Sequence, residues 1–277
     1  RDNAFLRRKI YPLYKDDRIG KGSNDELSIQ FADAAYAISC MGITQLAING
    51  YEADDVIAAL VRKFKSSGLR IIIVTGDKDL SQLVDSKTDV EVHLNNGKGN
   101  GPLKYEELMT EDDVVQKYGV DPIRIPDLFG LIGDKTDGIP GVPGMHKTIA
   151  PMLLSGNRFS SLEDLYSRLN DIRDEYPGMS ASQLRTLLEN NREIAFISKL
   201  LASPLPVELN VTLGTAIVDP DPIPLMTFME TNGLEKRNSS LGMNATLPEM
   251  RRYMAIIRLL IACNNDYYTK GKSMLTD

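Results

Sequence analysis

The sequence predicts an α/β fold in which a mostly parallel central sheet is flanked by helices and is followed by a largely helical part. The first observation is the alternation of strand-like and helix-like segments up to residue 94, which is typical of a parallel sheet. The second is segment 70–75 (RIIIVT), whose continuous apolar run is typical of a strand that is buried on both faces. The third is the change to helical periodicity after about residue 105.

The first long helix is preceded by a basic and aromatic segment, residues 5–18. Ser23 or Asn24 can cap this helix, which ends near Gly42. Strands are expected at 45–48, 70–75 and 88–94. Further helices are expected at 53–66, 111–118, 123–132, 147–154, 161–170, 181–190, 192–201 and about 247–263, with a proline-rich extended stretch at 204–224.

The composition is that of an ordinary globular protein. Of the 277 residues, 42% are apolar and 25% are charged. No apolar run approaches the roughly 18 residues that a membrane-spanning helix needs. The longest candidate, 254–263, is interrupted by Arg258. We therefore expect no membrane partner.

The two cysteines, Cys40 and Cys263, both lie in apolar helical segments. This placement favours buried free thiols over a disulfide or a metal site. Free thiols indicate a reducing, intracellular compartment. The sequence does not distinguish a bacterial or viral cytoplasm from an organelle matrix.

Charge is distributed unevenly along the chain. The net charge is −6, which by itself argues against a nucleic-acid partner. Residues 1–24, however, hold seven basic residues against three acidic ones. Such a basic stretch can bind phosphates in a protein that is acidic overall, if the remaining carboxylates bind a cation.

Acidic residues gather in three clusters, two of which directly follow predicted strands. Taken singly, each cluster can be explained as helix caps or turn formers. Ligand sites of open α/β sheets lie beyond the carboxyl ends of strands, however, and closely packed carboxylates repel one another unless a cation is present. The pattern therefore predicts a site for two Mg²⁺ or Mn²⁺ ions. Its candidate ligands are Glu52, Asp54, Asp55, Asp77, Asp79, Asp134 and Asp137.

Three strings carry these acidic residues: GYEADDVIAAL, TGDKDLSQLV and LIGDKTDGIPGVPG. In this order and at these separations they resemble the 5′-nuclease domain of bacterial DNA polymerase I and its stand-alone relatives in the flap-endonuclease superfamily. The segment LRRKIYPLYKDDR resembles the basic signature of that family's helical arch. Near the other end, NNREIAFISKLLAS and PVELNV resemble the family's closing helices and strand. The resemblance implies a PIN-like nuclease fold.

The resemblance also implies roles for the acidic residues. Asp54, Asp55 and Asp77 would be close metal ligands, and Glu52 would support them. Asp79, together with the third cluster, would form a more distant part of the site.

The arch would occupy about residues 5–25. Its Arg7, Lys15 and Arg18 would act at the scissile phosphate, and Lys21 would also contact nucleic acid. Tyr14 would stack on a base; a helix-surface aromatic is the plainer alternative.

The family's helix–hairpin–helix turn has a degenerate counterpart within 133–155. Gly144, His146, Lys147 and Thr148 are the candidate duplex contacts, and K⁺ is a candidate ion at this turn. His146 replaces the family's second glycine, so it is either a phosphate contact or a turn residue that weakens the motif. Pro151 falls inside the following helix.

Two aspartates of the family lie upstream of Arg7 in register and have no counterpart in this sequence. Either they lie in residues that are not recorded here, or the protein is a degenerate member. The first alternative predicts a metal-dependent 5′-3′ exonuclease or flap endonuclease. The second predicts an inactive relative that serves as a structural or nucleic-acid-binding component of a larger assembly. A small-molecule phosphohydrolase fits poorly with the arch-like segment.

We expect three regions: an α/β nuclease core at 1–105, a helical part at 106–235 and an extra helical tail at 236–277. The expected partner is nucleic acid, with DNA bearing a 5′ end or flap favoured and RNA as an alternative. A protein partner would bind through the tail.

Overall fold

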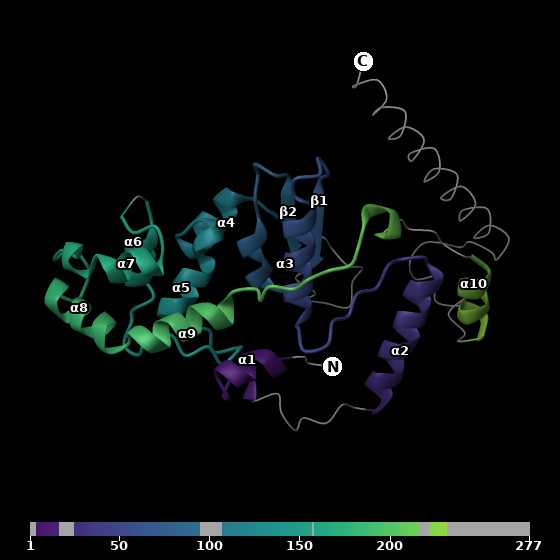
Figure 1. The fold of residues 1–277 in the computed structure, drawn as a ribbon, viewed down its shortest axis with the longest axis horizontal. Coiled ribbons are helices and arrows are strands. Elements are labelled where there is room, and N and C mark those ends of the chain that lie inside the picture. Colours follow the sequence, from purple (N-terminus) through teal and green to yellow (C-terminus); the bar gives the residue numbers. More distant parts are fainter. Residues whose placement is uncertain (1–3, 17–24, 95–106, 157, 217–221, 232–277) are drawn as a thin grey trace, which may run out of the picture. The chain divides into compact units, whose positions relative to one another are not determined.

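The computed structural model describes residues 4–16, 25–94, 107–156, 158–216 and 222–231 (Figure 1). The chain forms two compact units. One comprises Arg1–Lys21 and Ala47–Leu209, and the other comprises Gly22–Leu46 and Asn210–Asp277. Several predicted features fall outside the described residues: Arg18, Lys21, Cys263, the tail, and the region boundaries at 105/106 and 235/236.

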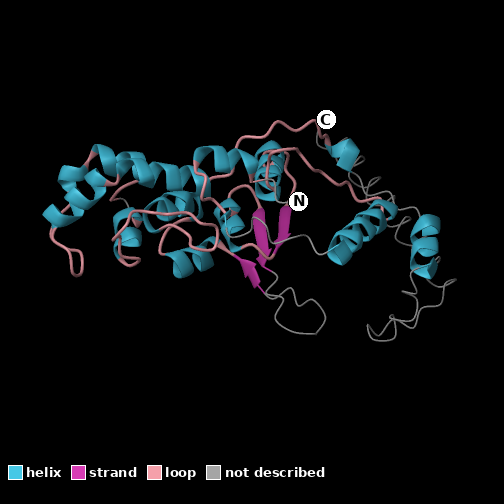
Figure 2. Cartoon of the chain, turned by 90° about the horizontal axis from the view of Figure 1, so that it is seen from below, coloured by secondary structure: helices cyan, strands magenta, loops and turns pink. Residues whose placement is uncertain are grey.

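The first unit contains a three-stranded sheet in the order β1-β2-β3 (Figure 2). β1 and β2 are parallel, with Ile71 opposite Val90, and β3 runs antiparallel to β2. The bounds are Ile71–Thr75 for β1, Val90–Leu94 for β2 and Glu107–Met109 for β3. The parallel pair and its flanking helices confirm the predicted α/β class, while β3 was not predicted.

The predicted strand at 45–48 is wrong. These residues have no regular secondary structure, because no described strand pairs with them. An apolar run of this length forms a strand only where a neighbour supplies ladder hydrogen bonds.

Helices follow the predicted pattern closely in the first unit. Thr110 caps α4 by accepting a hydrogen bond from the Asp113 backbone N–H, and Gly119, with φ of 73°, ends it. The predicted helix 161–170 is interrupted, because α7 stops at Ser167 and a 3₁₀ turn follows. The helices are α1 (Phe5–Ile10), α3 (Ala53–Phe64), α4 (Glu111–Tyr118), α5 (Ile125–Ile132), α6 (Ile149–Leu154), α7 (Leu162–Ser167), α8 (Ala181–Asn190) and α9 (Arg192–Ala202). The 3₁₀ turns are η2 (Lys78–Leu83), η3 (Pro122–Arg124) and η4 (Leu169–Asp171).

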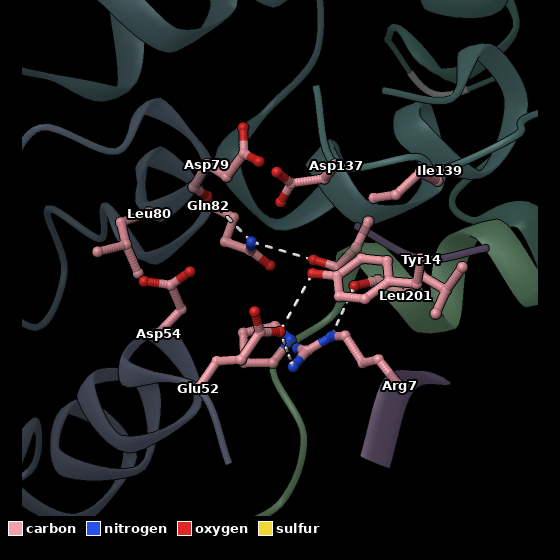
Figure 3. Close-up of a pocket in the computed structure, with 12 residues that line it drawn as sticks. Arg7, Tyr14, Glu52, Asp54, Asp79, Leu80, Gln82, Asp137, Ile139 and Leu201 are labelled. Carbon is pink, nitrogen blue, oxygen red and sulfur yellow. Dashed lines mark hydrogen bonds and ion pairs between the residues drawn. The ribbon is translucent and has the colours of Figure 1, made fainter. Parts of the chain in front are cut away.

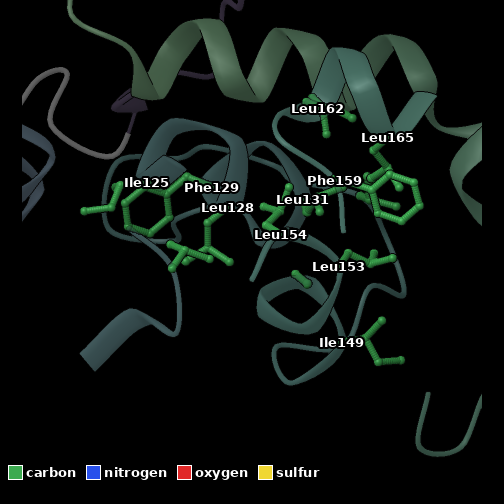
Figure 4. Close-up of a cluster of buried hydrophobic side chains, with 14 of the residues drawn as sticks. Ile125, Leu128, Phe129, Leu131, Ile149, Leu153, Leu154, Phe159, Leu162 and Leu165 are labelled. Carbon is green, nitrogen blue, oxygen red and sulfur yellow. The ribbon is translucent and has the colours of Figure 1, made fainter. Parts of the chain in front are cut away.

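One hydrophobic core joins the sheet to the helical part and includes residues from Val61 to Ala195. Figure 4 shows the part of this core between Ile125 and Leu165. Its centre is α5, which packs closely against α9. A Cβ atom at Gly130 would lie 3.0 Å from the Ala195 carbonyl oxygen, so glycine permits this close approach. The shared core fixes the acidic segments of the sheet relative to the helical part.

The second unit contains α2 (Asp25–Cys40), η5 (Leu213–Ala216) and α10 (Pro222–Thr231). The rings of Tyr36 and Phe228 lie 5.6 Å apart, which brings α2 and α10 together. The predicted extended stretch 204–224 includes the 3₁₀ turn η5 and the first residues of α10. Cys40 is a buried free thiol, as predicted. Within the described ranges, every helix is too short or too polar to cross a bilayer.

Candidate functional site

The first turn of α3 positions three of the acidic residues. Gly50, with φ of 85°, turns the chain just before Glu52. The Asp55 side chain then accepts a hydrogen bond from the Glu52 backbone N–H at 2.9 Å, which fixes the start of the helix. Consecutive helical residues point about 100° apart. Asp55 consequently points into the interior, whereas Asp54 lines a pocket.

Asp55 is fully buried, and its two oxygens are occupied by protein donors. The Arg7 guanidinium binds both oxygens, at 2.7 and 2.9 Å. The backbone N–H groups of Glu52 and Leu205 donate at 2.9 and 2.8 Å. Burial opposes the charged form, but Arg7 outweighs it and lowers the pKa of Asp55. The resemblance implied a close metal ligand, whereas the structure makes Asp55 a structural anchor, because four donors fill its acceptor positions.

Arg7 is itself buried and uses all five guanidinium N–H groups. Besides Asp55 it binds Glu52 Oε2 at 2.7 Å and the carbonyl oxygens of Leu201 and Ser203. It thus ties α1 to α3 and to the end of α9. The resemblance placed Arg7 on the arch at the scissile phosphate, whereas in this structure all five of its donors bind protein groups.

Tyr14 and Lys15 also point inward from the turn that follows α1. The Tyr14 hydroxyl donates to Glu52 Oε2 at 3.1 Å, and burial followed by the Glu52 charge raises the pKa of Tyr14 above its usual range. Lys15 Nζ lies 2.6 Å from Glu52 Oε1 and 3.2 Å from Asp137 Oδ2. Only 3% of Tyr14 is exposed, so its ring offers no face on which a base could stack.

Asp77 and Asp79 directly follow β1, at the carboxyl end of the strand. Thr75 Oγ1 accepts from the Asp77 N–H, and Asp77 Oδ1 accepts from the Asp79 N–H, both at 2.9 Å. These bonds fold the chain into the η2 turn. Asp79 Oδ1 is buried, and no described residue donates a hydrogen bond to it.

The loop between α5 and α6 carries Asp134 and Asp137. Asp134 Oδ1 accepts from the Thr136 N–H at 2.8 Å, and its Oδ2 lies 3.3 Å from Lys78 Nζ. Gly133 and Gly141 face each other so closely that a Cβ at Gly141 would lie 2.3 Å from the Gly133 nitrogen. The glycines therefore allow this loop to double back and present its carboxylates beside η2.

Four carboxylates from three separate segments surround one small pocket (Figure 3). Its cavity volume is about 30 Å³, which accommodates roughly two water-sized probes. The pocket carboxylates are those of Glu52, Asp54, Asp79 and Asp137.

Sequence reasoning missed part of the pocket lining. Gln82 donates to the Asp79 carbonyl at 3.0 Å, and Leu201, Ala202 and Pro204 close one side. Gln82 follows Asp79 in the η2 turn, whereas tertiary packing brings Leu201, Ala202 and Pro204 to the pocket.

Charge repulsion is pronounced in the pocket. Burial, followed by the nearby Asp77 charge, raises the pKa of Asp54 to about 6. Burial, Asp77 and Asp134 raise the pKa of Asp79 to about 7. The neighbouring cations, Lys15 and Arg7 at Asp54 and Lys78 at Asp79, do not offset this rise in pKa, so a further positive charge would stabilise both carboxylates.

This donor set fits a divalent cation in its chemistry. The ligands are hard oxygens, one of them without a hydrogen bond, in a pocket of the right size for a small ion. In the part of the chain that the structure describes, however, no three His, Cys, Asp or Glu side chains converge tightly enough to form a metal nest. The predicted convergence of Asp54, Asp55 and Asp77 is therefore not found.

The hairpin segment forms a turn that leads directly into α6. Gly144 has φ of 88°, which favours glycine. His146 Nδ1 and Thr148 Oγ1 share a hydrogen bond of 2.7 Å, so His146 acts as a turn residue here. Pro151 lies in the first turn of α6, where its missing N–H costs no helical hydrogen bond. Gly144, His146, Lys147 and Thr148 are all exposed.

Fold and site together define an α/β protein with a carboxylate pocket beyond the end of a parallel strand, continued by a helical part. Comparison with known proteins agrees with this class. Residues 1–119 match the family model described as 5′-3′ exonuclease, N-terminal resolvase-like domain. Residues 120–219 match the one described as 5′-3′ exonuclease, C-terminal SAM fold.

Individual relatives point to the same family. The chain is 38% identical over 197 residues to DNA polymerase I of Caldicellulosiruptor bescii. The matched region covers 71% of this chain and 21% of that protein. It is 32% identical over 214 residues to the 5′-3′ exonuclease of Buchnera aphidicola subsp. Acyrthosiphon pisum, covering 77% and 68%. This chain therefore belongs to the 5′-3′ exonuclease family.

The fold is also that of a solved nuclease. The flap endonuclease of bacteriophage T5, crystallised as a pseudo-enzyme–product complex with DNA and metal ions, superposes with a TM-score of 0.54 at 18% identity. The match covers 72% of this chain and 70% of that one. The predicted PIN-like nuclease fold is confirmed.

Proposed function

We propose that this chain carries the nuclease chemistry of its family and hydrolyses phosphodiester bonds near a 5′ end or at a flap, with divalent cations. One observation carries the proposal: a buried carboxylate oxygen of Asp79 lacks a hydrogen-bond partner among the described residues, in a pocket lined by four carboxylates. The T5 relative, which binds DNA and metal ions, supports it.

We propose that Asp54, Asp79 and Asp137 hold the cations in the pocket that they line, with Asp77 beside Asp79 and with Asp134 farther away. Two Mg²⁺ or Mn²⁺ ions at this position would polarise the scissile phosphate and make a water molecule a better nucleophile. The protein's own share is positioning. Arg7 and Lys15 hold Glu52 in place, and the η2 turn fixes Asp77 and Asp79 relative to β1.

We further propose that the nucleic acid is DNA with a 5′ end or flap. The exposed hairpin residues Gly144, His146, Lys147 and Thr148 would meet duplex phosphates, with K⁺ as a candidate ion there. Arg18 and Lys21 would contact the single-stranded end.

The test is cleavage of end-labelled 5′-flap DNA and RNA by the full chain, with Mg²⁺ or with chelator. We expect Mg²⁺-dependent cleavage of DNA that Asp77→Asn abolishes, because this change removes a charge while it keeps the shape. Asp121→Asn is a matched control, since Asp121 lies on the surface and pairs with Arg124 instead. Equal turnover in wild type and Asp77→Asn would contradict cation-assisted catalysis at this pocket.

A second candidate function is nucleic-acid binding without cleavage, as a component of an assembly. This function is favoured by the absence, among the described residues, of a group of three His, Cys, Asp or Glu side chains that could hold a metal ion. Retention of flap DNA in a gel-shift assay, together with no cleavage at any Mg²⁺ concentration, would support this function.

A further inference from the structure

Lys15 occupies an unusual position for a lysine. Its side chain is only 7% exposed, and its Nζ bridges Glu52 Oε1 at 2.6 Å and Asp137 Oδ2 at 3.2 Å. Both partners line the carboxylate pocket. The ammonium thus already supplies a positive charge to two of the four pocket carboxylates.

The backbone holds this ammonium in place. The Lys15 N–H donates to the Asp137 carbonyl oxygen at 3.0 Å. A Cβ at Gly138 would lie 2.9 Å from the Leu13 carbonyl, so the loop of Asp137 is pressed against the turn of Lys15. Lys15 itself has φ of 51°, a left-handed conformation that side chains rarely adopt. A strained residue is kept where surrounding contacts over-determine it.

We propose that Lys15 is the internal counter-ion of the cation-free site, and that a divalent cation entering the pocket competes with it for Glu52 and Asp137. The inference rests on the proposed function and adds a mode of regulation to it. The pocket volume, about 30 Å³, leaves little room for a hydrated ion beside the existing pair.

The neighbouring ion pair shows why Lys15, and not Arg7, is the competitor. Arg7 binds both oxygens of Asp55 through fixed bidentate bonds, and its remaining donors bind Glu52 and two backbone carbonyl oxygens. Lys15 is a point charge on a flexible stem, and a cation can replace it without leaving a backbone group unpaired.

The first experiment measures Mn²⁺ affinity by calorimetry for the full wild-type chain and for Lys15→Met. Removing a competing ligand should tighten Mn²⁺ binding about tenfold, a typical coupling between two ligands of one site. Lys199→Met is the matched control. Lys199 also bridges two carboxylates, Asp127 at 2.5 Å and Glu163 at 2.6 Å, but away from the pocket. Its Mn²⁺ affinity should stay within about twofold of wild type.

Equal or weaker Mn²⁺ binding by Lys15→Met would overturn the inference. If that variant does not fold, Lys15→Gln, which keeps a hydrogen-bond donor without the charge, provides the same comparison.

A second readout follows the amine itself. Wild-type protein is acylated with acetic anhydride in EDTA and in saturating Mn²⁺, and modified lysines are identified by mass spectrometry. We expect Lys15 to be protected in EDTA and to become reactive with Mn²⁺, while Lys199 stays protected in both. Mn²⁺ binding without exposure of Lys15 would overturn the inference and leave the proposed function standing. No Mn²⁺ binding by any variant would remove both.

Discussion

Replacing Arg7 by methionine removes the guanidinium and keeps an apolar stem of similar length. Five hydrogen bonds disappear, three of which bind the carboxylates of Asp55 and Glu52. Asp55, which is fully buried, then keeps only two backbone donors. Breaking one partner of a buried ion pair typically costs about 3–5 kcal/mol, because the remaining charge is left uncompensated.

We therefore expect Arg7→Met to lower the free energy of unfolding by about 4 kcal/mol and the melting temperature by about 10 °C. Urea unfolding at pH 7, followed by circular dichroism, measures the first value. Arg168→Met is the control, because the Arg168 side chain is 47% exposed and the side chains of its ion-pair partners Asp164 and Asp171 are 24% and 55% exposed. Its cost should stay below about 1 kcal/mol.

A double-mutant cycle isolates the pair itself. Asp55→Asn removes the second charge, so Arg7→Met and Asp55→Asn together should cost about 2 kcal/mol less than the sum of the single changes. Full additivity, or an Arg7→Met cost below about 1 kcal/mol, would refute the view that Arg7 is a structural tie.

In the native state the pKa of Asp79 is raised to about 7, whereas in the unfolded chain it is about 4. Between these pH values the native protein binds one proton more than the unfolded chain, so its stability falls as pH rises through this range. The loss of unfolding free energy between pH 5 and pH 8 should be roughly 2 kcal/mol smaller in Asp79→Asn than in wild type, measured by thermal unfolding with chelator. Identical pH profiles of the two proteins would contradict this prediction. Gly141→Ala should cost about 3 kcal/mol in urea unfolding, because its Cβ meets backbone, whereas Gly178→Ala, with nothing within 4 Å, should cost about 1 kcal/mol. Lys147→Ala should lower the salt slope of duplex-DNA binding by about 0.9 and Lys117→Ala should not; equal slopes would exclude the hairpin contact.

The sequence predicted the elements whose signals are local. The apolar run of β1 and the helical patterns of α4 and α8 depend on neighbouring residues, and the structure places these elements within a residue or two of their predicted bounds. β3 was missed because it has three residues and forms through its pairing with β2.

The site was harder to predict because burial of charge is a tertiary property. A basic and aromatic segment is typical of a phosphate-binding surface, and the neighbouring residues in the sequence do not indicate that Arg7 and Lys15 point inward. Their carboxylate partners at the start of α3, Glu52 and Asp55, lie 37 to 48 residues away. Asp54 and Asp55 are adjacent in sequence, yet the helical rotation separates a pocket residue from a buried anchor.

The most direct test of the cation site is an anomalous difference map from crystals of the full chain soaked in Mn²⁺. We expect a peak in the carboxylate pocket, with Asp79 Oδ1 and an oxygen of Asp54 at coordination distance and with Asp55 still bound to Arg7. Peaks confined to the surface, with Asp79 Oδ1 unliganded at saturating Mn²⁺, would contradict the proposed site.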